Sequence, residues 1–213
     1  MSQMLDTVLI GTLALNFCAL GVSRIRAVIR AVAAQGVALA CCLLLIHPHL
    51  DAHVVALVLV GIAIKGFVLP RLLLRAMREA DIQHEVKPMV GYPGSLFLGA
   101  MGTGLAILFT TRLPLAEGHA ETLVVPASLA TVWAGFLMLT TRKKAIMQVL
   151  GYLILENGIF LFGLLLLEAL PFLVEVGVLL DLFTGVFVMG IAIFHINREF
   201  SSISTEHLTG LKE

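Results

Sequence analysis

The sequence predicts an all-α, polytopic membrane protein with about seven transmembrane helices, and three observations support this prediction. Only 13% of the 213 residues are charged and 59% are hydrophobic, whereas soluble domains carry about 25% charged residues. Apolar runs recur along the chain, and several reach the roughly 20 residues that span a hydrocarbon core. The basic residues gather in alternate connections between these runs. The longest polar stretch, residues 77–93, is too short to bury a core of its own.

Each predicted span is an apolar run between polar, charged or helix-breaking residues. The first follows a short segment without the basic region and cleavage site of a signal peptide, so we expect it to be retained. The second begins beside Arg30, the third contains Pro70, and the fourth follows the long polar stretch. The fifth ends at a basic turn from which the sixth begins at once, and the seventh starts at a proline. The spans cover residues 4–22, 28–46, 54–74, 94–111, 123–141, 145–167 and 171–196.

The positive charges predict how these spans are oriented. Basic residues follow the first, third, fifth and seventh spans, whereas the opposite connections hold only Arg112. Short loops rich in Lys and Arg stay cytoplasmic, so we expect the N-terminus outside and the C-terminus in the cytoplasm, which requires an odd number of spans. The basic residues in question are Arg24, Arg26, Arg30, Arg71, Arg75, Arg78, Lys87, Arg142, Lys143, Lys144, Arg198 and Lys212.

Two parts of the chain share one plan, which predicts a parallel internal repeat of three-helix units. In each part a span ends in a basic turn, a second span begins at once, and a third span carries an ionisable residue. The repeat aligns Gln35-Gly36 with Glu156-Asn157-Gly158. The units would be residues 1–78 and 123–200, joined by a cytoplasmic loop, a connecting fourth helix and an outer loop over 79–122. Residues 201–213 would form a cytoplasmic tail.

Lys65, Glu156 and Asp181 are the candidate functional residues, because each interrupts a long apolar run. A charge near the bilayer centre costs a few kcal/mol or more, so such residues usually have a partner or a function. Glu156 lies about 18 Å along its helix from Lys144, near the midplane, and Asn157 stands beside it. Removal from water disfavours the charged forms of acids and lysine, which favours proton exchange. A lateral proton pathway is therefore one hypothesis.

The residues alone leave other interpretations open. Lys65 could instead pair with Glu156 or Asp181 as an ion pair that only holds the bundle together. His195, at the inner end of the seventh span, is either the end of a proton path or a hydrogen-bonded residue at a helix end. A seven-helix carrier or photoreceptor is a third class. A retinal protein, however, holds its lysine in the last span, and the predicted seventh span of this chain contains no lysine.

Other candidate sites have simpler explanations. The segment His47-Pro-His49-Leu-Asp51-Ala-His53 contains metal-ligand residue types, but no regular element fixes its geometry, and a solvated loop is favoured. The three cysteines lack the spacing of an iron–sulfur site. Pro70 removes a backbone donor and predicts a kink in the third span. We therefore expect this chain to bind no cofactor or metal.

The run Arg142-Lys-Lys144 followed by Gly151-Tyr-Leu-Ile-Leu-Glu156-Asn157 resembles the small K subunit of NADH–quinone oxidoreductase and its counterpart in Mrp-type cation/proton antiporters. Over its whole length the chain is similar to the hydrogenase-4 component E family. Gly151, Asn157 and Gly185 match the pattern of the K subunit. The first glutamate of that pattern would fall at Leu153, one turn before Glu156, and Asp181 replaces the second acid.

This resemblance implies a membrane subunit of a formate hydrogenlyase-type, energy-converting nickel–iron hydrogenase in the bacterial inner membrane. Such a subunit holds no catalytic centre, and the nickel–iron centre and iron–sulfur clusters lie on partner subunits. The partners would be antiporter-like membrane subunits and peripheral hydrogenase subunits, with lipid around them and no nucleic acid. The implied role is proton translocation through Lys65, Glu156, Asn157, Asp181 and His195. The alternative is a structural subunit that only anchors or assembles such a complex or a related Mrp-type antiporter.

Overall fold

The fold is a bundle of long antiparallel helices, seen in a computed structural model that describes residues 2–46, 52–79, 88–113, 123–164, 180, 183–187 and 190. Within these ranges, six helices are long and apolar enough to cross a membrane. They correspond to the first six predicted spans. The elements are α1 (Ser2–Gly21), α2 (Ile25–Ile46), α3 (Ala52–Ala63), η1 (Ile64–Val68), α4 (Leu69–Glu79), α5 (Tyr92–Thr110), α6 (Val124–Thr141) and α7 (Ala145–Gly163).

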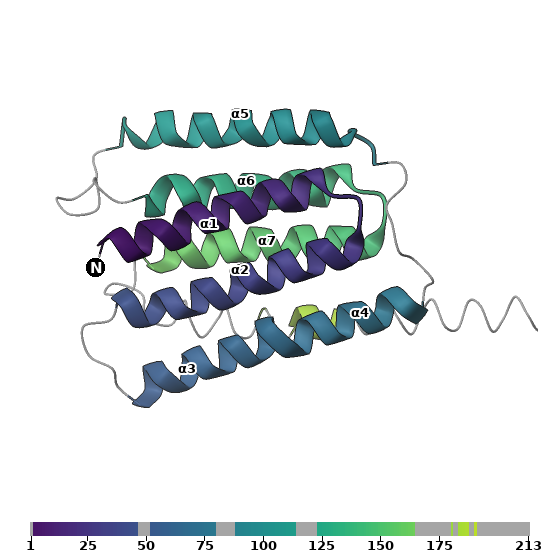
Figure 1. Cartoon of the computed structure of the whole chain (residues 1–213), viewed down its shortest axis with the longest axis horizontal. Helices are drawn as coiled ribbons and strands as arrows, with labels where there is room; N and C mark the ends of the chain where they lie inside the picture. Colours follow the sequence, from purple (N-terminus) through teal and green to yellow (C-terminus); the bar gives the residue numbers. More distant parts are fainter. Residues whose placement is uncertain are drawn as a thin grey trace, which may run out of the picture.

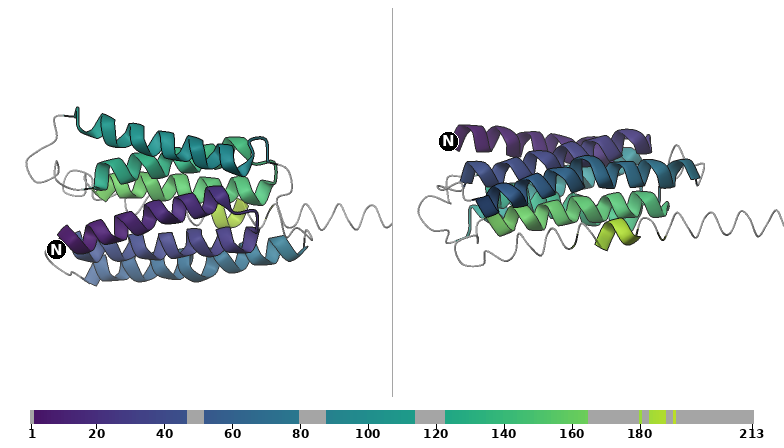
Figure 2. Two further views of the ribbon diagram at one scale, coloured as in Figure 1. Left: turned by 45° about the horizontal axis from the view of Figure 1, so that its top comes forward. Right: turned by 90° about the horizontal axis from the view of Figure 1, so that it is seen from below.

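The helices form two packed pairs with one further helix on each side. In Figures 1 and 2, α6 and α7 lie side by side, and α1 and α2 lie against them. The fourth predicted span, α5, packs on α1 and α6, while the continuous rod of α3, η1 and α4 packs on α2. The α1–α2 pair of the first predicted unit and the α6–α7 pair of the second therefore meet in the interior of the bundle.

Glycines let α6 and α7 approach until their backbones touch. A Cβ atom at Gly158 would lie 2.6 Å from the Val132 backbone nitrogen, and one at Gly151 would lie 2.7 Å from that of Leu139. A Cβ at Gly135 would fall on the backbone of Leu155. Such small-residue seams suit membranes, where packing and not hydrophobicity drives helix association. The seam fixes α7, and with it Glu156 and Asn157.

The basic turns gather at one end of the bundle, as the charge pattern predicts. The α1–α2 turn, the end of α4 and the α6–α7 turn lie at the end opposite the N-terminus in Figure 1. Helix α2 begins at Ile25, three residues before the predicted start, because the Arg24 carbonyl already accepts from the nitrogens of Ala27 and Val28. Arg26 therefore belongs to the helix and points outward. Most of the predicted seventh span lies outside the described residues.

A π-helical turn interrupts the third span around Lys65. In η1 the hydrogen bonding widens by one residue, so that the Leu69 nitrogen donates to the Ile64 carbonyl. Pro70 follows directly and has no N–H to give to the carbonyl four residues before it. The sequence predicts a kink at Pro70, and the structure has a wide helical turn just before it. Turns of this type are common at functional sites in helices.

Candidate functional site: a buried polar network

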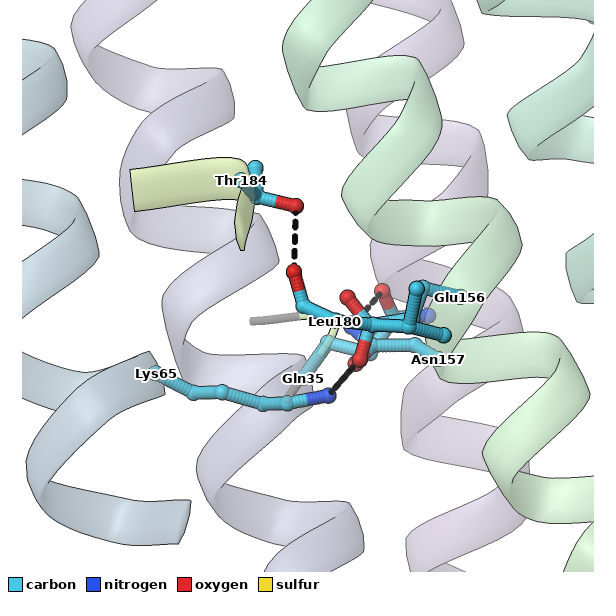
Figure 3. A network of polar contacts seen from close by, with 6 residues as sticks. All are labelled: Gln35, Lys65, Glu156, Asn157, Leu180 and Thr184. Carbon is cyan, nitrogen blue, oxygen red and sulfur yellow. Dashed lines mark hydrogen bonds and ion pairs between the residues drawn. The ribbon is translucent and has the colours of Figure 1, made fainter. Parts of the chain in front are cut away.

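The centre of the bundle holds an ion pair between two of the predicted residues. Lys65 Nζ lies 3.0 Å from Glu156 Oε1, and the side chains are 12% and 3% exposed. Lys65 comes from η1 and Glu156 from the middle of α7, 91 residues away in sequence. Figure 3 shows the lysine reaching across to α7. The structure thus brings together two of the three charges that the sequence places inside the membrane.

Asn157 gives Lys65 a second acceptor on the same helix. Lys65 Nζ donates to Asn157 Oδ1 at 2.9 Å (Figure 3), and it lies 5.5 Å from the centre of the Phe160 ring. A carboxylate, a carbonyl dipole and an aromatic face all favour a positive charge at this point. Three residues of α7, Glu156, Asn157 and Phe160, thus surround the end of the lysine side chain.

A chain of side-chain hydrogen bonds leads away from Asn157 across the bundle. Asn157 Nδ2 donates to Gln35 Oε1 at 3.2 Å, and Gln35 Nε2 donates to Asn16 Oδ1 at 2.9 Å. Asn16 Nδ2 then donates to Thr131 Oγ1 at 2.9 Å, and that hydroxyl donates to the Ala127 carbonyl at 2.7 Å. With Lys65, the network joins η1, α7, α2, α1 and α6. Its neutral members are residues that are at most 3% exposed.

The two carboxylate oxygens of Glu156 differ in their hydrogen bonding, because only Oε1 accepts from Lys65. Oε2 is buried and accepts no hydrogen bond within the part of the chain that the structure describes. An acceptor buried in this way costs free energy, so it marks a position suited to a proton, a water or a polar group. Thr184, on the short helical segment 183–187, is drawn near this region in Figure 3, where its hydroxyl donates to the Leu180 carbonyl at 2.9 Å.

The local backbone makes room for Lys65. A Cβ atom on Gly36 of α2 would lie 2.9 Å from both Cβ and Cδ of Lys65, so the lysine passes over α2 where no side chain stands. A small pocket of about 10 Å³ borders Lys65 and Asn157 and is otherwise lined by Leu69, Pro70 and other apolar residues. This volume is close to that needed for one water molecule.

Arg142 is a second cation inside the bundle and is more deeply buried than Lys65, although the sequence groups it with a basic turn. It is 1% exposed, and its Nη2 donates to the Leu20 carbonyl at 2.6 Å. Its guanidinium lies 5.0 Å from the centre of the Tyr92 ring. Leu20 is in the last turn of α1, where carbonyls lack helical partners. Arg142 therefore joins the ends of α1 and α6 to the start of α5, while Lys143 and Lys144 are exposed.

Several predicted residues lie outside the described ranges. These are Asp181 and His195 of the proposed proton path, together with most of the His47–His53 segment. Conversely, the sequence analysis did not identify Asn16 and Thr131, and it treated Gln35 only as part of a repeat. A usable signal was present, because each is a polar residue near the middle of an apolar span. The repeat aligns Gln35 with the Glu156–Asn157 region, and in the structure Gln35 and Asn157 are hydrogen-bonded.

The described residues offer no obvious metal centre. No group of three or more His, Cys, Asp or Glu side chains with ligand geometry occurs among them. The cysteines Cys18, Cys41 and Cys42 are free thiols. The chemistry available at this site is therefore that of a buried ammonium, a carboxylate and carboxamides.

Comparison with known proteins places this bundle among bacterial relatives. No family model matches the chain, and no solved structure matches it. It is 33% identical over 101 residues to Hydrogenase-4 component E of Escherichia coli K12, and equally to that of Shigella flexneri. These matches cover 47% of this chain and 46% of each relative. The similarity to component E therefore extends over about half of the chain, whereas the sequence analysis expected it over the whole length. The likeness to the K subunit and to its Mrp-type counterpart stays a prediction.

A second relative extends over nearly the whole chain. The protein named Uncharacterized protein Rv0085, of Mycobacterium tuberculosis, is 34% identical over 192 residues. This match covers 89% of the present chain and 87% of the relative. Identity at this level over this length implies the same fold and a common origin. The chain therefore belongs to the same family as the mycobacterial protein Rv0085.

Proposed function

We propose that this protein is a non-catalytic membrane subunit of an energy-converting, formate hydrogenlyase-like hydrogenase complex, and that Lys65 and Glu156 belong to its membrane proton pathway. The similarity to Hydrogenase-4 component E supports the choice of complex. The observation that carries the proposal is the partly buried ion pair, with Lys65 Nζ 3.0 Å from Glu156 Oε1 in the interior of a helix bundle suited to membranes.

The geometry of the pair suits proton exchange. Transfer of a proton from the Lys65 ammonium to Glu156 Oε1 would give a neutral amine and a neutral acid, which the apolar interior tolerates better than separated charges. The second oxygen, Oε2, has no hydrogen-bond partner in the described ranges. Glu156 could thus take a proton through one oxygen and release it through the other. Asp181 and His195 are the proposed next positions on the path.

The proposal also specifies surroundings. The complex would lie in the bacterial cytoplasmic membrane, with antiporter-like membrane subunits beside this chain and peripheral hydrogenase subunits on the cytoplasmic side. Those subunits would hold the nickel–iron centre and the iron–sulfur clusters. Purification in mild detergent tests this directly, because partners that contain nickel and iron should co-purify. Recovery of the chain alone from membranes that retain hydrogenase activity would contradict the proposed complex.

Glu156→Gln tests the proton pathway. The intact complex carrying this variant should still evolve hydrogen, whereas the number of protons translocated per hydrogen in inverted vesicles should fall several-fold. Asp6→Asn is a matched control, because it makes the same acid-to-amide change at the first turns of α1, where Asp6 accepts from the Leu123 nitrogen at 3.5 Å. An assembled Glu156→Gln complex that translocates protons as the wild type does would refute the role of Glu156.

A purely structural role is the second candidate, and one observation favours it. Lys65 binds two neighbouring residues of α7, and the network behind them ties α7 to α2, α1 and α6. If the role is structural, Lys65→Met should prevent assembly, while Lys65→Met combined with Glu156→Gln should restore both assembly and proton translocation. If the pair belongs to a proton pathway, the double variant should assemble and remain uncoupled.

A further inference from the structure

The hydrogen bonds behind Lys65 all run in one direction. Lys65 can only donate, so Asn157 must present its carbonyl oxygen to it and its NH₂ group to Gln35. Gln35 must then accept from Asn157 and donate to Asn16, and Asn16 must accept from Gln35 and donate to Thr131. The order of donors along the network is Lys65, Asn157, Gln35, Asn16 and Thr131.

The far end of the network fixes the same direction independently. The Thr131 hydroxyl lies 2.7 Å from the Ala127 carbonyl, which can only accept, so the hydroxyl donates there and accepts from Asn16. If one amide were turned over, two NH₂ groups or two carbonyls would face each other in a buried site. Each unsatisfied polar group would then lose its hydrogen bonds to water without gaining a partner. Both ends therefore require that the Asn157 carbonyl face Lys65.

The chemistry of the network members also limits what they can do. Carboxamides neither gain nor lose a proton at ordinary pH, and the threonine hydroxyl is likewise not ionisable there. Among the residues that the structure describes, the hydrogen bonds of Lys65 thus lead to an acid, Glu156, on one side and through Asn157 to a row of fixed dipoles on the other. The network holds a cation in place and offers no ionisable group toward α1 and α6.

We propose that Gln35, Asn16 and Thr131 are positioning residues, which hold the Asn157 carbonyl toward Lys65 and so direct the Lys65 proton to Glu156. They act through Asn157 and do not contact the exchanging proton. The statement about proton direction rests on the proposed function, whereas the statement about Asn157 orientation stands on the hydrogen bonds alone. The two statements can therefore fail separately.

Solid-state NMR of the full chain in lipid bilayers measures the orientation. The sequence has three asparagines, so side-chain labelling of lysine with ¹⁵N and of asparagine with ¹³C gives a sparse spectrum. Lys65 Nζ should show a scalar coupling, transmitted through its N–H···O=C hydrogen bond, to one asparagine carbonyl carbon, that of Asn157; this coupling is the contact meant below, and Lys65→Met should remove it. Thr131→Val, which keeps the shape but removes the hydroxyl, should abolish or strongly weaken this contact. Thr131→Ser, which keeps the hydroxyl, should preserve it.

A second variant and a measurement on the unaltered chain protect the test against misfolding. Gln35→Met breaks the network next to Asn157 and should also lose the contact. In the unaltered chain with labelled glutamine nitrogen, the asparagine carbonyl that contacts Gln35 Nε2 should be Asn16, a different signal from the one that contacts Lys65. If a single asparagine carbonyl contacts both nitrogens, the network runs the other way and the inference is overturned.

The direction of proton transfer from Lys65 to Glu156 is tested separately, by proton translocation. In the intact complex, Thr131→Val should lower the proton-to-hydrogen ratio about as much as Asn157→Leu does, and Thr131→Ser should restore it to the wild-type value. A folded Thr131→Val variant that keeps the NMR contact would overturn the positioning role. A variant that loses the contact but translocates protons normally would instead overturn the proposed function of the Lys65–Glu156 pair.

Discussion

The aliphatic part of the Lys65 side chain crosses α2 at Gly36, where that helix has no side chain. A Cβ atom on Gly36 would approach within 2.9 Å of two carbons of Lys65, closer than carbon atoms pack. Gly36 directly follows Gln35, so the residue that binds Asn157 and the residue that admits Lys65 are neighbours on one helix. The position of the lysine is thus set by α2 as well as by α7.

Gly36→Ala should displace Lys65 and weaken its contacts with α7. Overpacking of this kind costs about 1–3 kcal/mol, which should appear as a lower unfolding temperature in detergent and as a loss of the Lys65–Asn157 contact. Gly11→Ala on α1 is the control, since nothing lies within 4 Å of its added Cβ. Equal unfolding temperatures for the two variants would show that the crossing is not tight.

Lys65→Met should be more destabilising alone than together with Glu156→Gln. The single variant leaves a buried carboxylate without its cation, at a cost of about 3–5 kcal/mol, whereas the double variant leaves no charge at all. Thermal unfolding of the wild type, both single variants and the double variant gives the coupling free energy of the pair. Strictly additive effects would mean that the ion pair contributes little to stability.

Arg142→Ala should destabilise the bundle far more than Lys143→Ala, although the residues are adjacent. Arg142 is buried against the Leu20 carbonyl and the Tyr92 ring, while Lys143 is exposed. Loss of a buried, hydrogen-bonded charge costs about 2–5 kcal/mol, whereas surface changes usually stay within about 0.5 kcal/mol. The unfolding temperatures of both variants in the same detergent measure the difference. Similar values for the two would contradict the role of Arg142 in joining the helix ends.

Gly135→Ala should separate α6 from α7, because its Cβ would fall on the Leu155 backbone, which cannot rotate away. We expect loss of more than about 3 kcal/mol or failure to fold. Gly104→Ala on α5 is the control, since its Cβ would meet open space. A cross-linking yield between cysteines placed on α6 and α7 would report the separation even in a partly folded variant. Normal cross-linking and stability would show that the seam tolerates a methyl group.

The helices themselves were predictable from sequence, because an apolar run of about 20 residues in lipid satisfies its backbone only as a helix. The depth of Lys65 and Glu156 followed from the same count. The ion pair between them could not be predicted, because the sequence of a helix does not show which neighbouring helix a side chain faces. By sequence alone, Asp181 was an equally good partner for Lys65. The sequence also predicted a break at Pro70, but not that it takes the form of a π turn at Lys65.

The neutral members of the network were harder to recognise. Thr131 can bond its own helix carbonyl, as it does with Ala127, so a threonine in an apolar span demands no distant partner. Asn16 and Gln35 are common enough in membrane helices as interhelical contacts. Only the packing of α1, α2, α6 and α7 around a common axis turns these separate residues into one network.

The glycine seam has a mechanical consequence for the ion pair. Because backbone meets backbone at Gly135, Gly151 and Gly158, α6 and α7 are in direct contact at three points along their length. Glu156 and Asn157 are therefore carried by a stiff double rod. Lys65 is carried by a π turn, where the regular ladder of the third span is already interrupted. We therefore expect any movement that lengthens the distance between the ammonium and the carboxylate to start on the lysine side, with α6 and α7 as its fixed reference.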